Sequence, residues 1–119
     1  MILSHITINT AKLDDSVAFY ENIIGLHIVR DMRGNKGPNI VFLSDERADF
    51  CIELVENSDH SFEGKGISIG FATQDLDKEA AVLKEKGITP GPVISPNPHT
   101  RFFFISDPNG VQIQFIEEK

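Results

Sequence analysis

The sequence is poor in several residue types, and each shortage excludes a class of protein. Its 119 residues contain no tryptophan and a single cysteine, Cys51, so no disulfide can form within the chain. Lysine and arginine number 11 against 18 aspartates and glutamates, and the resulting net charge of −7 argues against a nucleic-acid partner. No apolar run is long enough to span a membrane, and the first residues lack the basic start of a signal peptide. We therefore expect a cytoplasmic protein that binds neither nucleic acid nor a membrane.

The chain repeats itself, and this internal similarity is its most informative feature. An offset of 63 residues pairs residues 5–8 with 68–71, and an offset of 61 pairs residues 52–56 with 113–117. A fixed internal period indicates a duplicated structural unit. With 119 residues, the chain is predicted to form one domain made of two repeats.

Both repeats have the same predicted order of elements. The first contains an alternating strand, a helix that Gly25 ends, and three strands, at residues 2–9, 13–24, 26–32, 39–43 and 49–56. The second contains a strand, a helix capped by Asp75 and closed by Gly87, a proline-rich loop or weak edge strand, and two further strands, at residues 66–73, 76–86, 88–98, 100–105 and 111–116. The sequence therefore predicts an α+β fold of two β-α-β-β-β modules, about 1–57 and 66–119, with a linker at 58–65.

One face of each predicted sheet carries polar residues. A single helix per module covers only one face of its sheet, so the other face needs a partner, and we expect a homodimer. Polar side chains on an inward face cost free energy unless they line a wet cleft or hold a ligand. The candidate site therefore lies on this face, which includes His5 and Glu53 in the first module and Ser68 and Gln114 at the equivalent positions of the second.

A twofold β-α-β-β-β repeat with His5 on its first strand and Glu53 on its fourth resembles the vicinal oxygen chelate superfamily. This superfamily includes glyoxalase I, bleomycin-resistance proteins and extradiol dioxygenases. The segments that carry the resemblance are residues 5–8, 15–20 with 25–26, and 103–114. The resemblance implies curved, incompletely closed sheets that line a cleft between the modules. It also implies one divalent metal, held by the side chains at positions 5, 53, 68 and 114.

The sequence departs from the superfamily pattern at two of these four positions. Ser68 stands where a histidine is expected, and Gln114 stands where a glutamate is expected. We therefore expect no tightly bound ion. Any weakly held zinc, nickel, manganese or magnesium would rely on His5, Glu53 and Gln114. Gln114 has no titratable proton, which leaves Glu53 as the candidate catalytic base. The sequence argues against an extradiol dioxygenase, because only His5 remains of the two histidines and one carboxylate that such an enzyme uses.

The strand at residues 100–105 adds two candidate binding residues. Arg101 either clamps an anionic group of a substrate or pairs with an acidic side chain at the surface. The three phenylalanines at 102–104 alternate between faces, and Phe103 is a candidate wall of a ligand pocket. The predicted binding residues are thus His5, Ser68, Gln114, Arg101 and Phe103. Glu117 is out of phase with Gln114 and is expected to be solvated.

Two classes of function follow from these residues. The first is a small-molecule-binding protein of the bleomycin-resistance type with a degraded metal site. The alternative is a metal-dependent lyase or isomerase of the glyoxalase I type. Because this fold supports many chemistries, the identity of the ligand stays open, as does the pairing of the modules within one chain or across a dimer.

Overall fold

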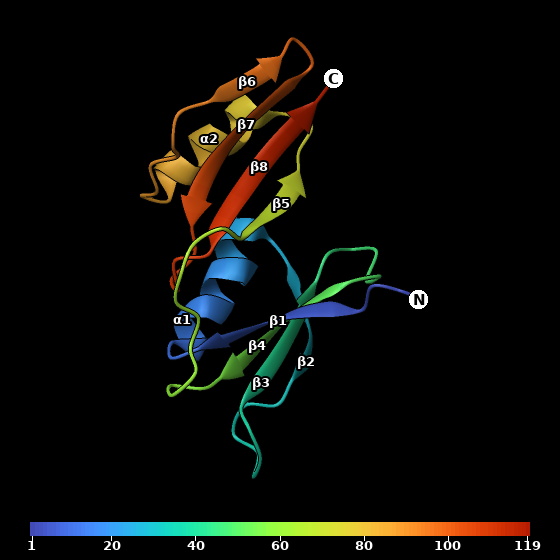
Figure 1. Ribbon diagram of the computed structural model, residues 1–119, viewed down its shortest axis with the longest axis vertical. Helices are drawn as coiled ribbons and strands as arrows, with labels where there is room; N and C mark the ends of the chain where they lie inside the picture. Colours follow the sequence, from blue (N-terminus) through green and yellow to red (C-terminus); the bar gives the residue numbers. More distant parts are fainter. The chain divides into compact units, whose positions relative to one another are not determined.

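The computed structural model describes all 119 residues, which form two compact units, Met1–Glu63 and Gly64–Lys119 (Figure 1). Each unit contains a strand, a helical segment and three further strands, in that order. The predicted duplication of β-α-β-β-β modules is therefore confirmed. None of the helices has both the length and the apolar character needed to cross a membrane.

The first unit is a four-stranded mixed sheet with one helical segment. Its elements are β1 (His5–Thr10), α1 (Leu13–Ala18), η1 (Phe19–Ile24), β2 (His27–Asp31), β3 (Ile40–Ser44) and β4 (Cys51–Glu56). The strand order is β1-β4-β3-β2, with β4 parallel to β1 and antiparallel to β3. Ile8, Leu54 and Val41 lie on one face of this sheet and are buried, and α1 packs against β4.

The helical segment of the first unit differs from the uniform helix that its apolar stripe predicts. It is α-helical as far as Ala18 and continues as the π-helix η1 from Phe19. Phe19 and Tyr20 are adjacent, yet both are buried, and their rings meet edge to face at 5.2 Å. The Tyr20 carbonyl accepts hydrogen bonds from the backbone amides of both Gly25 and Leu26. Gly25 ends the segment with φ 90°, a left-handed conformation that favours glycine.

The second unit repeats this architecture. Its elements are β5 (Ser68–Ala72), α2 (Leu76–Glu85), β6 (Ile94–Asn97), β7 (Thr100–Ser106) and β8 (Gln112–Glu118). The strand order β5-β8-β7-β6 matches that of the first sheet position by position. Asp75 caps α2 as predicted, since its side chain accepts a hydrogen bond from the Lys78 amide at 3.0 Å. The proline-rich stretch forms the short edge strand β6, whose four residues are all exposed.

Each sheet has one face that packs beneath its helical segment and one face that the helix leaves open. In the second unit, Phe103, Ile105, Ile113 and Phe115 form the buried face, and α2 packs against β8. Residues directly opposite one another in paired strands share a face. The register therefore assigns every strand residue to either the helix-covered face or the open face, and this assignment positions the candidate site.

Candidate functional site

The open face of the first sheet brings His5, Thr7 and Glu53 together. Thr7 and Glu53 are register partners in β1 and β4, and the Thr7 hydroxyl donates a hydrogen bond to Glu53 Oε1 at 2.5 Å. His5 Nε2 lies 3.8 Å from the same oxygen, and Ser4 Oγ lies 3.0 Å from His5 Nδ1. The alternation of β1 placed Thr7 on this face, but only the register identifies it as the direct partner of Glu53. A carboxylate held in this way accepts hydrogen bonds and can attract a cation.

Two further residues surround this group on the open face. Phe42 in β3 is the register partner of Glu53, and its ring meets the His5 ring edge to face at 6.3 Å. Cys51, the free cysteine, is the register partner of His5 and is partly exposed. Phe42 is not among the site residues that the sequence predicts. Its position directly opposite Glu53 in an antiparallel pair was the missing information.

The residues present do not fit a tight divalent metal site. In the first unit, only His5 and Glu53 are strong metal ligands, and Glu53 Oε1 already accepts the Thr7 hydrogen bond. The structure contains no group of three histidine, cysteine, aspartate or glutamate side chains that could hold a metal ion. The equivalent positions in the second unit offer the neutral amide of Gln114 and the neutral hydroxyl of Ser68. Structural and catalytic zinc sites use at least three protein ligands, which are mostly thiolate, carboxylate or imidazole groups.

The open face of the second sheet replaces the carboxylate with an amide. Gln114 in β8 is flanked by its register partners Gly70 in β5 and Phe104 in β7. A Cβ atom added to Gly70 would lie 3.2 Å from Gln114 Oε1, so the glutamine side chain lies against the glycine backbone. Thr7 and Glu53 occupy the equivalent row of the first unit. Glycine at position 70 thus makes room for the amide in the place where the first unit carries a hydroxyl.

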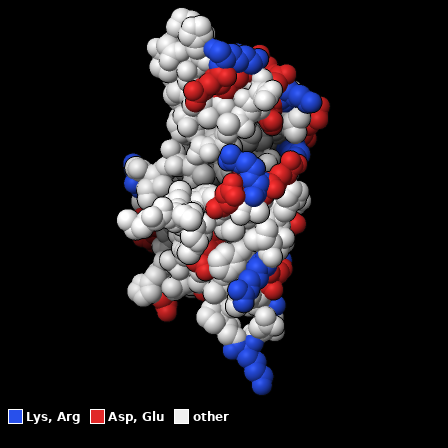
Figure 2. Space-filling view, turned by 90° about the vertical axis from the view of Figure 1, so that its right-hand side faces the viewer, with Lys and Arg blue, Asp and Glu red and all other residues white.

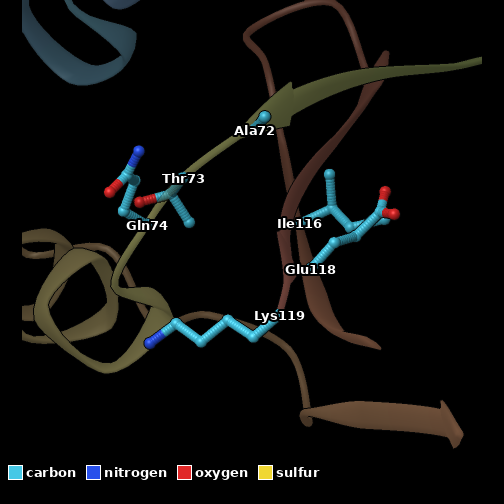
Figure 3. A pocket seen from close by; sticks show the side chains of 6 residues that line it. All are labelled: Ala72, Thr73, Gln74, Ile116, Glu118 and Lys119. Atoms are coloured by element: carbon cyan, nitrogen blue, oxygen red, sulfur yellow. The ribbon is translucent and has the colours of Figure 1, made fainter. Parts of the chain in front are cut away.

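Two hollows lie along this second sheet. One, of about 320 Å³, is lined by Gly66, Ile67, Ser68, Phe104 and Gln112. The other, of about 560 Å³, lies past the opposite end of β5 and is lined by Ala72, Thr73, Gln74, Ile116, Glu118 and Lys119 (Figure 3). The hollow beside Ser68 has no ionisable lining residue. In the other hollow, the consecutive residues Glu118 and Lys119 extend to opposite sides (Figure 3).

Arg101 lies on the helix-covered side of the second sheet, away from Gln114. Its guanidinium donates to Glu117 Oε2 at 3.0 and 3.1 Å and to Asp77 in α2 at 3.3 Å. Asp77 and Glu117 raise the pKa of Arg101. Of the two alternatives that the sequence offers for Arg101, the structure shows the ion pair with acidic side chains. Figure 2 shows the same arrangement more widely, since acidic and basic side chains lie next to one another over the visible face.

Glu117 corrects one expectation from the sequence. It was expected to be solvated, but it is buried, with 5% of its surface exposed. Glu117 and Gln114 occupy opposite faces, as the alternation of the strand predicts, but α2 covers the face that Glu117 occupies. Its Oε1 accepts a hydrogen bond from the Leu76 amide at 3.0 Å. This hydrogen bond, followed by the one from the Arg101 guanidinium, holds the pKa of the Glu117 carboxyl below its usual range.

Phe103 also lies on the covered face, and its position does not suit the predicted role as a pocket wall. Its side chain has 0% of its surface exposed and stacks on Phe115, with ring centroids 5.1 Å apart. The neighbours Phe102 and Phe104 face the opposite way and meet edge to face at 5.7 Å. Phe104, the register partner of Gln114, is therefore the aromatic residue of the open face that lies directly opposite Gln114.

Comparisons of sequence agree with this architecture. Residues 2–115 match the family model of the glyoxalase/bleomycin resistance protein/dioxygenase superfamily. A probable lactoylglutathione lyase from Vibrio cholerae is 30% identical, over 97% of this chain and 89% of that protein. A lactoylglutathione lyase from Neisseria meningitidis serogroup A is 27% identical, over 100% of this chain and 92% of that protein.

Solved structures match over almost the whole chain. A superfamily member from Sphaerobacter thermophilus has a TM-score of 0.78 and 26% identity, covering 99% of this chain and 98% of its own. TnmS3, an antibiotic-binding protein from a Streptomyces species, has a TM-score of 0.76 at 21% identity, covering 100% of this chain and 97% of its own, and so shares the fold. The family-model match and the repeated modules together show that the chain belongs to the glyoxalase/bleomycin resistance protein/dioxygenase superfamily.

Proposed function

We propose that the protein binds a small organic molecule on the open faces of its sheets and does so without a tightly bound metal. The observation that carries this proposal is the Gly70–Gln114–Phe104 row of the second unit. It places a neutral amide, a glycine and an aromatic ring where a metal-dependent enzyme of this superfamily would need a charged ligand. The sharing of the fold with an antibiotic-binding protein supports the same proposal.

A lyase or isomerase of the lactoylglutathione lyase type is the alternative. Its support is the 27–30% identity to proteins of that name and the contact between His5 and Glu53. In such an enzyme, Glu53 would be the base, because it is the carboxylate on the open face of the first sheet beside the histidine. We rank this alternative second because Gln114 cannot take up a proton and Arg101 is already bound by two carboxylates.

One set of measurements separates the two proposals. The metal content of the dialysed protein is determined by elemental analysis, and conversion of the methylglyoxal–glutathione hemithioacetal is followed with added nickel or zinc. We expect less than stoichiometric metal and no turnover. We also expect a thermal shift with at least one compound of a small-molecule library. Turnover that disappears in both His5→Ala and Glu53→Ala would establish the lyase instead.

We also propose that the chain acts as a homodimer in the cytoplasm. Each unit has a helix on one face of its sheet and leaves the other face open, and a second copy would provide a partner for such faces. The single free cysteine is compatible with a reducing compartment. Light scattering at micromolar concentration tests the assembly, and a monomer mass would refute it.

A further inference from the structure

We infer that the open face of the second unit selects an uncharged, planar ligand, and this inference rests on the proposed function. This ligand carries a hydrogen-bond donor and an acceptor side by side, as a lactam does. Gln114 supplies the complementary amide, Gly70 gives the amide its position, and Phe104 contacts the flat body of the ligand. The inference adds a ligand class and a specificity-determining glycine to the proposed binding activity.

The electrostatic surroundings favour a neutral ligand. The hollow of about 320 Å³ lies at Phe104, the register partner of Gln114, and its lining residues are Gly66, Ile67, Ser68, Phe104 and Gln112, none of which ionises. Lys65 precedes Gly66 in the chain, but it is exposed and does not line the hollow. The open face carries a carboxylate only at Glu118, four residues beyond Gln114 along β8, a span of about 13 Å in a strand. A charged ligand would give up its hydration without meeting an opposite charge.

The polar groups on this face are matched to an amide-like partner. The Gln114 amide has one donor group and one acceptor oxygen, and the structure records no hydrogen bond from its side chain to another residue. Beside it, Gln112 Nε2 donates to Ser106 Oγ at 2.8 Å, which leaves the Gln112 oxygen as an acceptor. The Ser68 hydroxyl lies in the same hollow and can both donate and accept. These groups fit a ligand that offers both a carbonyl and an N–H.

Gly70 controls the position of the amide. Because a Cβ at position 70 would lie 3.2 Å from Gln114 Oε1, even alanine requires the glutamine to move by a few tenths of an ångström. Gly70 does not have a left-handed φ, so a larger residue is not excluded by backbone conformation. Threonine, the residue at the equivalent position of the first unit, would displace the amide further. Position 70 is thus expected to affect ligand affinity more than stability.

Phe104 supplies the flat apolar contact. It is partly exposed and is held edge to face by Phe102, with ring centroids 5.7 Å apart. Phe104 is also the register partner of Gln114, so the ring and the amide lie in the same row. A planar ligand can therefore stack on or abut the ring while its polar edge meets Gln114.

The test compares the binding of two probes of similar size, one neutral and one anionic. 2-Quinolone is a neutral bicyclic lactam, and quinoline-2-carboxylate is its anionic counterpart. The chain contains no tryptophan, so the fluorescence of either probe can be titrated with little protein background. We expect 2-quinolone to bind at least about tenfold more tightly than the carboxylate, since the carboxylate is desolvated without a cation.

Variants locate the binding. We expect Gly70→Thr to weaken 2-quinolone binding about tenfold, with a smaller loss in Gly70→Ala, and Phe104→Leu to weaken it about fivefold. The matched control is Gly37→Thr, because a Cβ at Gly37 meets nothing within 4 Å and Gly37 has no left-handed φ. The control should bind 2-quinolone like the unaltered protein, and thermal denaturation checks that every variant is folded.

Several results would overturn the inference, and they differ in what they say about the proposed function. Failure of 2-quinolone to bind at millimolar concentration, or equal affinity in Gly70→Thr, Phe104→Leu and the control, rejects the assigned ligand class or its location. Tighter binding of the carboxylate that is lost in His5→Ala leaves small-molecule binding intact but rejects selection for neutral ligands. Binding of neither probe, combined with hemithioacetal turnover, rejects both proposals.

Discussion

The assignment of Phe103 and Phe104 to opposite faces of β7 predicts very different effects for two neighbouring substitutions. Phe103 has 0% of its surface exposed and stacks on Phe115, whereas Phe104 is partly exposed beside Gln114. Phe103→Ala removes a fully buried ring and leaves a cavity, which costs about 3–5 kcal/mol. Phe104→Ala removes a ring that retains solvent contact and leaves no closed cavity, so we expect a loss of about 1 kcal/mol or less.

These free energies translate into separable melting temperatures. The entropy of unfolding is about 2 cal/mol/K per residue, which gives roughly 0.25 kcal/mol/K for the 119 residues. A loss of about 4 kcal/mol therefore lowers the melting temperature by roughly 15 °C, and a loss of about 1 kcal/mol lowers it by roughly 4 °C. If the second unit unfolds by itself, both shifts become larger, but their ratio is unchanged.

Circular dichroism melts and urea titrations of the two variants measure the difference. Phe103→Leu serves as the matched intermediate, because it keeps an apolar side chain in the core and is expected to cost less than Phe103→Ala. In binding assays, the order should reverse: Phe104→Ala weakens 2-quinolone binding, and Phe103→Leu leaves it near that of the unaltered protein. Equal destabilisation by Phe103→Ala and Phe104→Ala would refute the face assignment, and with it the placement of Phe104 at the site.

Three further outcomes are expected. The double variant Ser68→His with Gln114→Glu should bind a metal ion, because it gains an imidazole and a carboxylate. Elemental analysis after zinc loading and dialysis measures the bound zinc. About one zinc ion per chain in the unaltered protein would contradict the prediction. Glu117 has a folded-state pKa below the ordinary 4.5, so its charge stabilises the fold at neutral pH, and this contribution is lost as the pH falls through the lowered value. The melting temperature of the unaltered protein should therefore fall more steeply below pH 4.5 than that of Glu117→Gln, and parallel curves would contradict this. Asp75→Ala should lower the free energy of unfolding, measured by urea titration, by about 1 kcal/mol. Asp75→Asn should lower it much less, because asparagine also caps helices. Equal losses in the two variants would contradict the capping role of Asp75.

The strand faces and the module order were predictable from the sequence because both follow from periodicity. Alternation correctly separated Gln114 from Glu117 and grouped His5 with Thr7. What alternation cannot supply is which face a helix covers, since that depends on contacts between segments far apart in the chain. For this reason Glu117 was expected in solvent, although Leu76 and Arg101 bind it beneath α2.

Element boundaries show the same limit. The alternating pattern from Ile2 predicts a strand that starts earlier than β1, which begins at His5. Cys51, the first residue of β4, is the register partner of His5, so the residues before Ser4 have no paired neighbour and remain exposed. The predicted helix over 13–24 becomes π-helical from Phe19, where the adjacent Phe19 and Tyr20 side chains are both buried, and a strict 3.6-residue period does not anticipate this.

The two units differ most informatively in one row of their open faces, where both members of a register pair differ between the units. In the first unit, Glu53 is paired with Thr7, and the hydroxyl donates directly to the carboxylate. In the second, Gln114 is paired with Gly70, and the glycine leaves the space that the amide fills. A glutamate opposite glycine would lack the hydroxyl that donates a hydrogen bond to it. A glutamine opposite threonine would clash with the threonine side chain in the position that it occupies beside Gly70. Each pair is therefore consistent within itself, one anionic and one neutral, on sheets of the same topology. The duplication has preserved the strand order that builds the open face while the chemistry of the two faces has diverged.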